Sequence, residues 1–502
     1  MKRINLKPLI FISIAGIFVG CNSTARNDEE TRQTVKPNII LIVSDDHGTG
    51  DAGCYGNTAI KTPNMDQLAS EGMKFTNAYC TSASCSASRS VILTGLYNHA
   101  NGQYGHKHNY NHFSAYDHIK SLPVLLDEFA GYETARIGKY HVAPDKVFHF
   151  ETVLNADQRN PVAMADSCLD FIRANKHNPF FLYFCTSDPH RGGGTVDDNS
   201  YKPDRFGNKD EGYDGVKQIN FSPYDVIVPD YLPNTPECRA ELAQYYQSVA
   251  RLDQGMGRLF KHLKNQGLWD NSIVIYISDN GIAFPGAKTN VYEPGIHLPC
   301  IIKNVNNKNK GTTNHAKINW ADLAPTILDY AGALKESRDL LKTRWEAQKD
   351  QGDDTYNKDF HGRSFKEVLE NNVSKGWDTV YASHTFHEIT MYYPMRTIVT
   401  NKYKLIWNIA HNLPYPHASD LWASSTWQSA LNSENRTYAF KTVDYYNHRP
   451  EFELFDLEND PQEAENLAGK PAYHEILANL KDELRVFQKR TNDPWIIKWE
   501  HE

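Results

Sequence analysis

The sequence has no repeat period, no long low-complexity tract and no excess of positive charge. The first two absences exclude solenoid, collagen-like, coiled-coil and disordered chains. The 53 Lys and Arg residues stand against 61 Asp and Glu residues, a formal net charge of -8, which argues against a nucleic-acid coat because such surfaces are basic. What remains is a folded chain of 502 residues, long enough for roughly two to four domains, or for one large α/β domain and a smaller one.

The N-terminus also lacks a hydrophobic run of membrane-spanning length. Met1–Arg3 is positively charged, and Pro8–Gly20 is apolar but shorter than the roughly 20 residues that a spanning helix needs. This pattern predicts a signal peptide. The tetrapeptide ending at Cys21 resembles a bacterial lipobox, in which the cysteine is lipidated. We therefore expect 1–21 to direct an exported lipoprotein of the periplasm or outer membrane, held by its lipid alone, with 22–36 as a polar linker; plain cleaved secretion is the alternative.

Cysteine is scarce, with eight residues in the chain. Without Cys21, seven remain, and because seven is odd at least one is expected outside an intramolecular disulfide. A buried free thiol is the ordinary fate of such a residue.

Three apolar runs predict buried parallel strands, namely Ile39–Val43, Phe180–Phe184 and Ile273–Ile277. Helical stretches separate them, so the fold class is α/β. Each run is followed by polar residues, and open α/β sheets bind ligands beyond the carboxyl ends of their strands. We therefore expect the three strand ends to face one cleft. The charged stretch Lys335–Lys358 predicts a surface excursion, to which no chemistry is assigned.

The C-terminal part shows a different pattern. Short β-like segments at Met395–Thr400 and Tyr403–Asn408, and a helix near Tyr473–Lys489, predict a smaller α+β domain. The expected organisation is a main domain over 37–376 and the smaller domain over 377–502.

Cys85 is expected at the start of a helix that runs to about Thr94, with Gly95 as its C-cap. Free backbone N–H groups and the helix dipole favour an anion at such a position. Arg89 lies four residues on, on the same helix face. This segment taken alone fits equally well a nucleophile beside a fixed cation or a Ser-rich helix start of no special role.

Two strand ends carry oxygen ligands. Asp45 and Asp46 follow the first strand, and Asp279 and Asn280 follow the third. Oxygen-only ligands suit a hard cation such as Ca²⁺ or Mg²⁺ and disfavour zinc. Either pair alone is more often a capped loop or a turn, but together they predict a metal site.

Several cations could complete an anion site. Lys139 and His141 are two residues apart and would project from one face if 138–142 is extended. His190 follows the second strand, and Lys288 lies in a loop after Asn280. Without the other motifs, a Lys and a His on an exposed strand are common in proteins and indicate no particular function.

The segment Cys85–Gly95, which reads Cys-Ser-Ala-Ser-Arg-Ser-Val-Ile-Leu-Thr-Gly, resembles the type I sulfatase signature, Cys-x-Pro/Ala-x-Arg followed by Leu-Thr-Gly. Four further motifs stand in the order of that family, namely Asp45-Asp46, Gly138–His141, Pro189-His190 and Ser278–Gly281. The resemblance covers about 37–495. In 223–236, 279–295 and 383–396 it is closest to the sulfamidases, which hydrolyse the N-sulfate of glucosamine.

The resemblance implies an alkaline-phosphatase-like sandwich with a large mixed, mostly parallel sheet. It implies a formylglycine made from Cys85 by a maturation enzyme, and a divalent cation, with calcium favoured over magnesium. The implied activity is hydrolysis of N-linked sulfate from glucosamine N-sulfate residues in heparin or heparan sulfate fragments. The hydrated aldehyde would attack sulfur, with His190 as first and Lys288 as second choice for the acid, and His141 or a carboxylate as the later base.

The implied catalytic residues are Cys85, Arg89, Lys139, His141, His190 and Lys288, and the implied metal ligands are Asp45, Asp46, Cys85, Asp279 and Asn280. Candidates for sugar contacts are Asp188, Arg191, His384, His387 and Glu388, with surface or interdomain hydrogen bonds as the alternative. Two positions depart from the family pattern, because Ala87 replaces the commoner Pro and Lys288 stands where related sulfamidases often carry Arg.

Three other functions stay open. The first is an O-sulfatase acting on glycosaminoglycan or mucin sugars, such as 6-O-sulfated N-acetylglucosamine. The second, a phosphatase or phosphodiesterase, would want a Ser or Thr nucleophile and two zinc ions. The third is a glycan-binding lipoprotein in which Cys85 is never converted.

Overall fold

The computed structural model describes residues 36–108, 110–192, 203–305, 308–349 and 355–501. Lys36–Glu502 form one compact unit. The predicted signal peptide, Cys21 and nearly all of the predicted linker lie outside the described residues. Among those described, no helix combines the length and the apolar character needed to cross a membrane.

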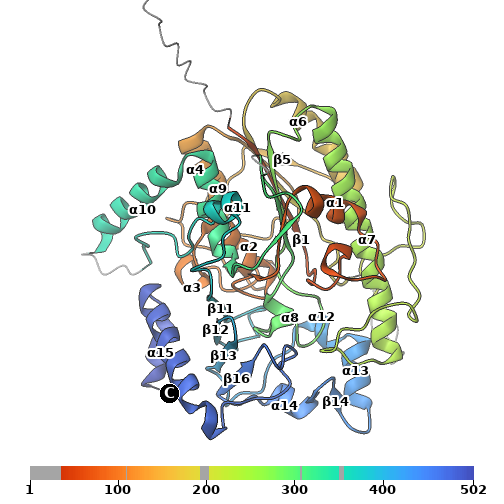
Figure 1. The fold of residues 1–502 in the computed structure, drawn as a ribbon, viewed down its shortest axis with the longest axis vertical. Helices are drawn as coiled ribbons and strands as arrows, with labels where there is room; N and C mark the ends of the chain where they lie inside the picture. Colours follow the sequence, from red (N-terminus) through yellow and green to blue (C-terminus); the bar gives the residue numbers. More distant parts are fainter. Residues whose placement is uncertain (1–35, 109, 193–202, 306–307, 350–354, 502) are drawn as a thin grey trace, which may run out of the picture. The chain divides into compact units, whose positions relative to one another are not determined.

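A large mixed sheet lies at the centre of the molecule (Figure 1). In spatial order its strands are β5 (Thr152–Leu154), β4 (Glu133–Gly138), β6 (Phe180–Cys185), β1 (Asn38–Ser44), β7 (Ser272–Ser278), β8 (Cys300–Lys303), β2 (Met73–Phe75) and β9 (Thr312–Asn314). Neighbouring strands are parallel except at β8, which is antiparallel to both β7 and β2. The three strands predicted from apolar runs are the adjacent β6, β1 and β7, and they are buried throughout. The α/β prediction is confirmed.

Helices cover both faces of this sheet (Figure 1). One side carries α1 (Pro63–Glu71), α6 (Leu169–Ala174) and the long α7 (Pro236–Asn265). Helix α5 (Pro161–Ser167) packs against α7. The other side carries α2 (Cys85–Thr94), α4 (Leu122–Ala130), α9 (Leu323–Ala331), α10 (Leu334–Gln348) and α11 (Lys366–Asn371). The predicted helix at Cys85 is confirmed, and Gly95 ends it with φ +67°, a conformation that favours glycine.

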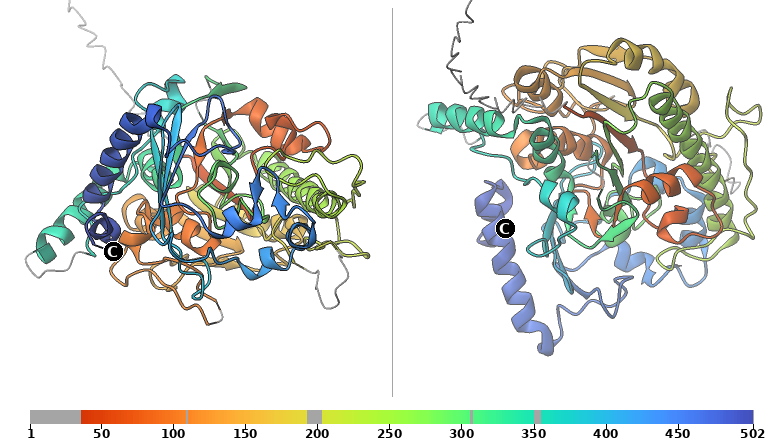
Figure 2. Two further views of the ribbon diagram at one scale, coloured as in Figure 1. Left: turned by 90° about the horizontal axis from the view of Figure 1, so that it is seen from below. Right: turned by 45° about the horizontal axis from the view of Figure 1, so that its top comes forward.

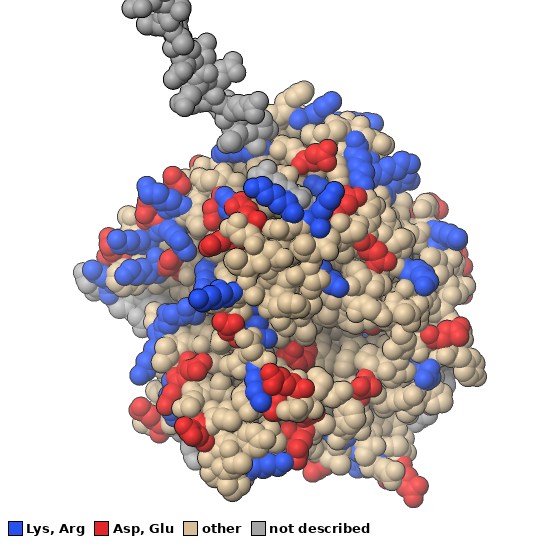
Figure 3. Space-filling model, in the orientation of Figure 1, with Lys and Arg blue, Asp and Glu red and all other residues tan. Residues whose placement is uncertain are grey.

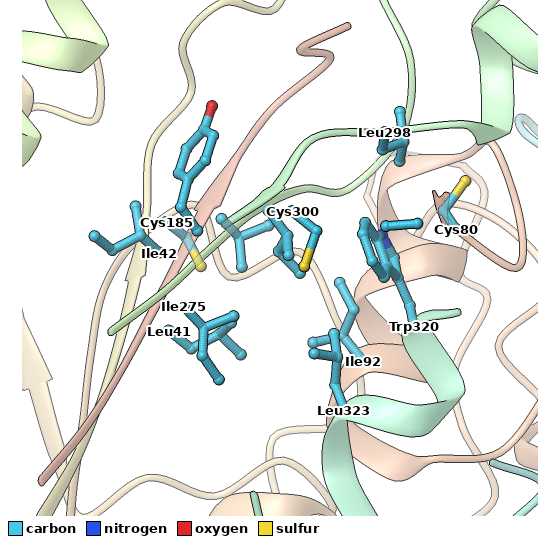
Figure 4. Close-up of a cluster of buried hydrophobic side chains, with 14 of the residues drawn as sticks. Leu41, Ile42, Cys80, Ile92, Cys185, Ile275, Leu298, Cys300, Trp320 and Leu323 are labelled. Carbon is cyan, nitrogen blue, oxygen red and sulfur yellow. The ribbon is translucent and has the colours of Figure 1, made fainter. Parts of the chain in front are cut away.

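Apolar side chains fix α2 against the sheet. Leu41 and Ile275 of the central strands, Ile92 of α2 and Leu323 of α9 are buried in one cluster (Figure 4). Full burial of such a side chain contributes about 1.5–3 kcal/mol. The packing therefore holds the first residue of α2 beside the carboxyl ends of β1 and β7.

A four-stranded antiparallel sheet forms the C-terminal part. Its order is β11 (Val380–His384), β12 (Met395–Val399), β13 (Tyr403–Asn408) and β16 (Phe452–Asp456). Helix α15 (His474–Arg490) lies along it (Figure 2) and packs Leu484 and Phe487 into an apolar cluster with the strands. The two predicted strands and the terminal helix agree with β12, β13 and α15 to within a residue. The domain boundary between 376 and 377, just before β11, stays a prediction.

Short elements join these parts. They are α3 (Asn98–Asn101), α8 (Glu293–Ile296), α12 (Ser419–Trp422), α13 (Ser425–Asn432), α14 (Val443–Asn447), the paired β3 (Ala78–Tyr79) and β10 (Ile318–Asn319), the paired β14 (Thr437–Tyr438) and β15 (Lys441–Thr442), and 3-10 turns at Gly53–Tyr55, Trp320–Asp322, Pro471–Tyr473 and Pro494–Trp499.

The backbone after β4 and the state of the cysteines can be compared with the predictions from the sequence. The chain is not extended over 138–142, since β4 ends at Gly138 and His141 has φ +55°. All seven cysteines in the described residues are free, and only Cys54 among them is not fully buried.

Candidate active site

Strand register brings the acidic residues together. β1 and β7 are parallel neighbours, and Ser44 lies opposite Ser278, so the residues after each strand end side by side. The backbone N–H of Asp46 donates to Asp279 Oδ1 at 3.1 Å, and Asn280 Nδ2 donates to Asp46 Oδ1 at 2.6 Å. The predicted meeting of the two strand ends is confirmed.

Cys85, the first residue of α2, faces the same group. Its Sγ lies 3.4 Å from Asp45 Oδ1 and 3.7 Å from Asp46 Oδ1. One potential ligand atom from each of Asp45, Asp46, Cys85 and Asp279 falls within 4.8 Å of the others. Burial raises the pKa of the Cys85 thiol well above its ordinary value; Lys139 opposes this rise, while the carboxylates add to it. The unmodified residue is therefore a neutral thiol.

These residues fit a hard divalent cation. Burial raises the pKa of Asp279, and the charges of Asp45 and Asp46 raise it further against the effect of Arg89. A cation would relieve that repulsion between buried carboxylates. Asn280 Oδ1 is buried and has no hydrogen-bond partner within the described part of the chain. An unpaired amide oxygen among carboxylates is a donor set for Ca²⁺ or Mg²⁺ rather than for zinc.

Two cations, the buried Arg89 and the partly buried Lys139, offset the negative charge of the carboxylates. Arg89 Nε donates to Asp279 Oδ2 at 2.8 Å, and Nη2 forms an ion pair with the same oxygen at 2.8 Å. Its Nη1 donates to the carbonyl of Lys139 at 2.9 Å. Lys139 Nζ contacts Asp45 Oδ2. Burial alone would raise the pKa of Asp45, but Lys139, His190 and Arg89 together hold it well below its ordinary value.

Lys288 forms a second cationic centre. Its Nζ lies 3.1 Å from Asp46 Oδ2, 2.9 Å from Asp420 Oδ2 and 3.2 Å from His190 Nε2. Burial would lower the pKa of Lys288, but Asp420 and Asp46 outweigh burial and raise it, so the ammonium stays charged. Burial and the neighbouring Lys288 lower the pKa of His190, which leaves this imidazole neutral. Sequence analysis missed Asp420, because its segment carries no motif and reaches the site only through tertiary packing.

Four histidines line up beside Lys139. His108 Nδ1 lies 2.6 Å from His141 Nε2, His106 Nδ1 lies 3.4 Å from the His108 ring, and His106 Nε2 lies 3.0 Å from His387 Nδ1. Burial lowers the pKa of His141, His106 and His387 well below the ordinary value, so the chain of rings is neutral. Sequence analysis missed His106 and His108, although the local concentration of histidine in 106–112 was a signal.

A cavity of about 580 Å³ opens over these groups. Its basic lining comes from Lys107, Arg136, Lys139 and Lys288, its acidic lining from Asp145, Glu388 and Asp420, and its imidazoles from His106, His108, His141, His190 and His387. Although the whole chain is acidic, this wall offers cations to an anion. Lys139 and His141 share the cavity even though the backbone between them is not extended.

Three of the predicted sugar-contact residues do not line this cavity. Asp188 accepts from Arg251 Nε and Nη2, each at 2.7 Å, and from Arg159. Arg191 donates twice to Glu241, at 2.7 and 2.8 Å. His384 is buried at the end of β11. Asp188 and Arg191 link their loop to α7 through ion pairs and do not line the cavity, so their geometry does not provide a substrate contact. His387 and Glu388 do line the cavity.

An α/β sandwich whose strand ends carry oxygen ligands suited to a cation, with basic side chains around them, fits a hydrolase of anionic esters or amides. The sulfatase family model matches residues 37–333. The model for the C-terminal region of N-sulphoglucosamine sulphohydrolase matches 430–490. The chain belongs to the sulfatase family.

Individual proteins that are similar to this chain are also sulfatases or sulfamidases. The chain is 36% identical over 475 residues to human N-sulphoglucosamine sulphohydrolase, covering 91% of each. It is 26% identical to the N-acetylglucosamine-6-O-sulfatase of Bacteroides thetaiotaomicron, covering 97% of this chain and 91% of that protein. A structure solved with its substrate D-glucosamine-2-N,6-O-disulfate superposes with a TM-score of 0.64 at 22% identity, over 93% of this chain and 100% of that one. The fold is the alkaline-phosphatase-like sandwich.

Proposed function

We propose that this enzyme hydrolyses the N-linked sulfate of glucosamine N-sulfate residues in heparin or heparan sulfate fragments. The observation that carries the proposal is the 36% identity to human N-sulphoglucosamine sulphohydrolase across nearly the whole chain, including the matched C-terminal region. The cavity supports it, because Lys139 and Lys288 offer two charged ammonium groups to a sulfate beside Cys85.

In this proposal Asp45, Asp46, Asp279 and Asn280 hold a calcium ion, together with the modified side chain of residue 85. The cation supplies Lewis-acid activation of the sulfate oxygens and of the nucleophile. Oxidation of Cys85 to formylglycine by a maturation enzyme supplies an aldehyde, a nucleophile precursor that a buried, neutral thiol cannot replace. Arg89 supports the site by holding Asp279 in place through its two contacts.

Breaking an N–S bond releases an amine, which leaves readily only when it is protonated. We propose His190 as the residue that delivers the proton. The charged ammonium of Lys288 lies 3.2 Å from His190 Nε2 and keeps its own proton, so the proton that His190 delivers is taken up from solvent through the cavity. A bound sulfate adds negative charge next to His190 and so favours its protonated form. His141, which lines the same cavity, is the proposed base for the return of residue 85 to its starting state.

His387 and Glu388 are the proposed contacts for sugar hydroxyl groups, since both line the cavity. Glu388 Oε1 accepts from Ser419 Oγ at 2.8 Å, which holds the carboxylate at the rim. The fixed carboxylate can accept a sugar hydroxyl with its other oxygen.

A second candidate is hydrolysis of a 6-O-sulfate. It is favoured by the similarity to an N-acetylglucosamine-6-O-sulfatase and by the neighbour whose substrate carries both N- and 6-O-sulfate. Matured protein should be incubated with glucosamine N-sulfate and, in parallel, with 6-O-sulfated N-acetylglucosamine, and the release of sulfate and of free amine should be followed. Release from the N-sulfate alone supports the proposal; release from the O-sulfate alone overturns it in favour of the second candidate.

We also propose that the protein is an exported lipoprotein anchored through Cys21. Cys21→Ala should move the protein from the membrane fraction to the soluble fraction of a producing bacterium. Unchanged membrane association of that variant would overturn the anchor.

A further inference from the structure

A second cavity, also of about 580 Å³, lies between α10, the segment 357–361 and the end of α15. These three pieces are far apart in sequence. Sequence analysis assigned no chemistry to the stretch that contains α10, and the proposed reaction uses none of these residues.

The second cavity is rich in positive charge. Its basic lining comes from Arg338, Lys342, Lys358 and Arg490, against the two carboxylates Asp339 and Asp359. Arg338 Nε is paired with Asp359 Oδ1 at 3.1 Å, so one carboxylate is already neutralised. Lys342 and Arg490 are exposed side chains. Figure 3 shows Lys and Arg side chains, with fewer acidic ones, gathered on the side of the molecule where α10 lies.

An aromatic wall accompanies these charges. Trp345 of α10 lines the cavity and is half-buried. Lys358 Nζ lies 5.3 Å from the centre of its ring. An indole beside ammonium and guanidinium groups presents a flat apolar surface and charged donors together, which matches a sugar ring that carries sulfate.

The segment 99–108 runs from residues that line the second cavity to the active-site cavity. Near its start, His99 Nε2 lies 3.1 Å from the carbonyl of Thr491, and the carbonyl of Ala100 accepts from Asn357 Nδ2 at 3.3 Å, both at the second cavity. Its end, 106–108, lines the active-site cavity. The chain from His99 to His106 spans at most about 25 Å even when fully extended. An oligosaccharide of several sugars can bridge such a distance.

We propose that the second cavity binds a sulfated portion of the same glycan chain whose terminal sugar occupies the active site. The identity of the glycan rests on the proposed function. Binding at two linked sites raises the effective concentration of the second contact, so longer chains are held more tightly than a single sugar.

The test uses matured full-length protein and two substrates, glucosamine N-sulfate and a heparin-derived hexasaccharide. The double variant Lys342→Ala/Arg490→Ala removes two positive charges from the second cavity. Lys176→Ala/Lys261→Ala removes two exposed charges outside the lining of both cavities and is the matched control. We expect the ratio of the hexasaccharide KM to the monosaccharide KM to rise about three- to tenfold in the first variant, as for loss of two exposed ion pairs, and to stay unchanged in the control.

Binding is measured separately so that the two proposals can fail independently. The hexasaccharide is titrated into protein carrying Cys85→Ala, with and without the Lys342/Arg490 substitutions. Weaker binding only with those substitutions supports the second site even if no sulfate is released from either substrate, a result that would refute the proposed function alone. Equal effects of both charge-removing variants, or no effect of either, would overturn the second site while leaving the function intact.

Discussion

Lys288 Nζ donates to Asp420 at 2.9 Å while it also lies 3.1 Å from Asp46. Asp46 follows the central strand of the large sheet, whereas Asp420 belongs to α12 in the C-terminal part. The ammonium therefore joins the proposed metal site to a segment far along the chain. The C-terminal part completes the site as well as packing beside it.

Asp420→Asn is expected to lower kcat/KM for the N-sulfated substrate by about tenfold. The amide keeps the shape of the side chain but loses the charge that holds Lys288 between two carboxylates, a change worth on the order of 1.4 kcal/mol. Steady-state kinetics measure this, with the neighbouring Ser419→Ala as the control for local disturbance. Wild-type kinetics in Asp420→Asn would show that Asp46 alone suffices to place Lys288.

Cys85→Ala is expected to reduce turnover by at least about a thousandfold, because the residue supplies the proposed nucleophile. The thermal unfolding midpoint should change little, since the missing atom is small and α2 is held by its apolar face. Cys168→Ala, which removes a buried thiol outside the cavity lining, is the matched control and should remain active. Substantial activity in Cys85→Ala would refute the mechanism.

Removal of the proposed metal ion should abolish activity and lower stability together. Without the cation, buried carboxylates repel one another, so chelation is expected to lower the unfolding midpoint as well as the rate. Adding back calcium should restore both, magnesium in part, and zinc least, since the donors are oxygens. Recovery with zinc but not calcium would favour a phosphatase-like centre over the proposed one.

Arg191→Ala should act on stability rather than on substrate binding. Burial would raise the pKa of Glu241, but Arg191 outweighs burial and keeps it ionised. Loss of the guanidinium leaves an unpaired buried charge, which costs about 3–5 kcal/mol of unfolding free energy. Denaturant unfolding measures this, and Arg191→Met combined with Glu241→Leu should recover much of the loss. A raised KM at unchanged stability would instead reinstate Arg191 as a substrate contact.

Much of the site was predictable because its residues stand in local sequence patterns. Apolar runs fix the three central strands, and the residues that follow parallel strands must emerge at one edge of a sheet. The helix that begins at Cys85 could be read from its Gly95 cap, and the oxygen ligands at the two strand ends indicate a hard cation. These inferences depend on neighbours in the chain, and strand register then brings Asp46, Asp279 and Asn280 together.

Other features depend on contacts between distant segments, which no local pattern encodes. Asp188 and Arg191 follow the same strand as His190, yet buried arginine and glutamate partners on α7 turn both away from the cavity. Asp420 of α12 and His108 reach the cavity only through tertiary packing. The sequence by itself therefore determined the central strands of the sheet and the places of the proposed metal ligands and nucleophile at their ends. Tertiary structure decided which charged side chains line the cavity and which form buried ion pairs with each other. The reason is that a buried charge requires a partner, and the whole fold sets the position of that partner.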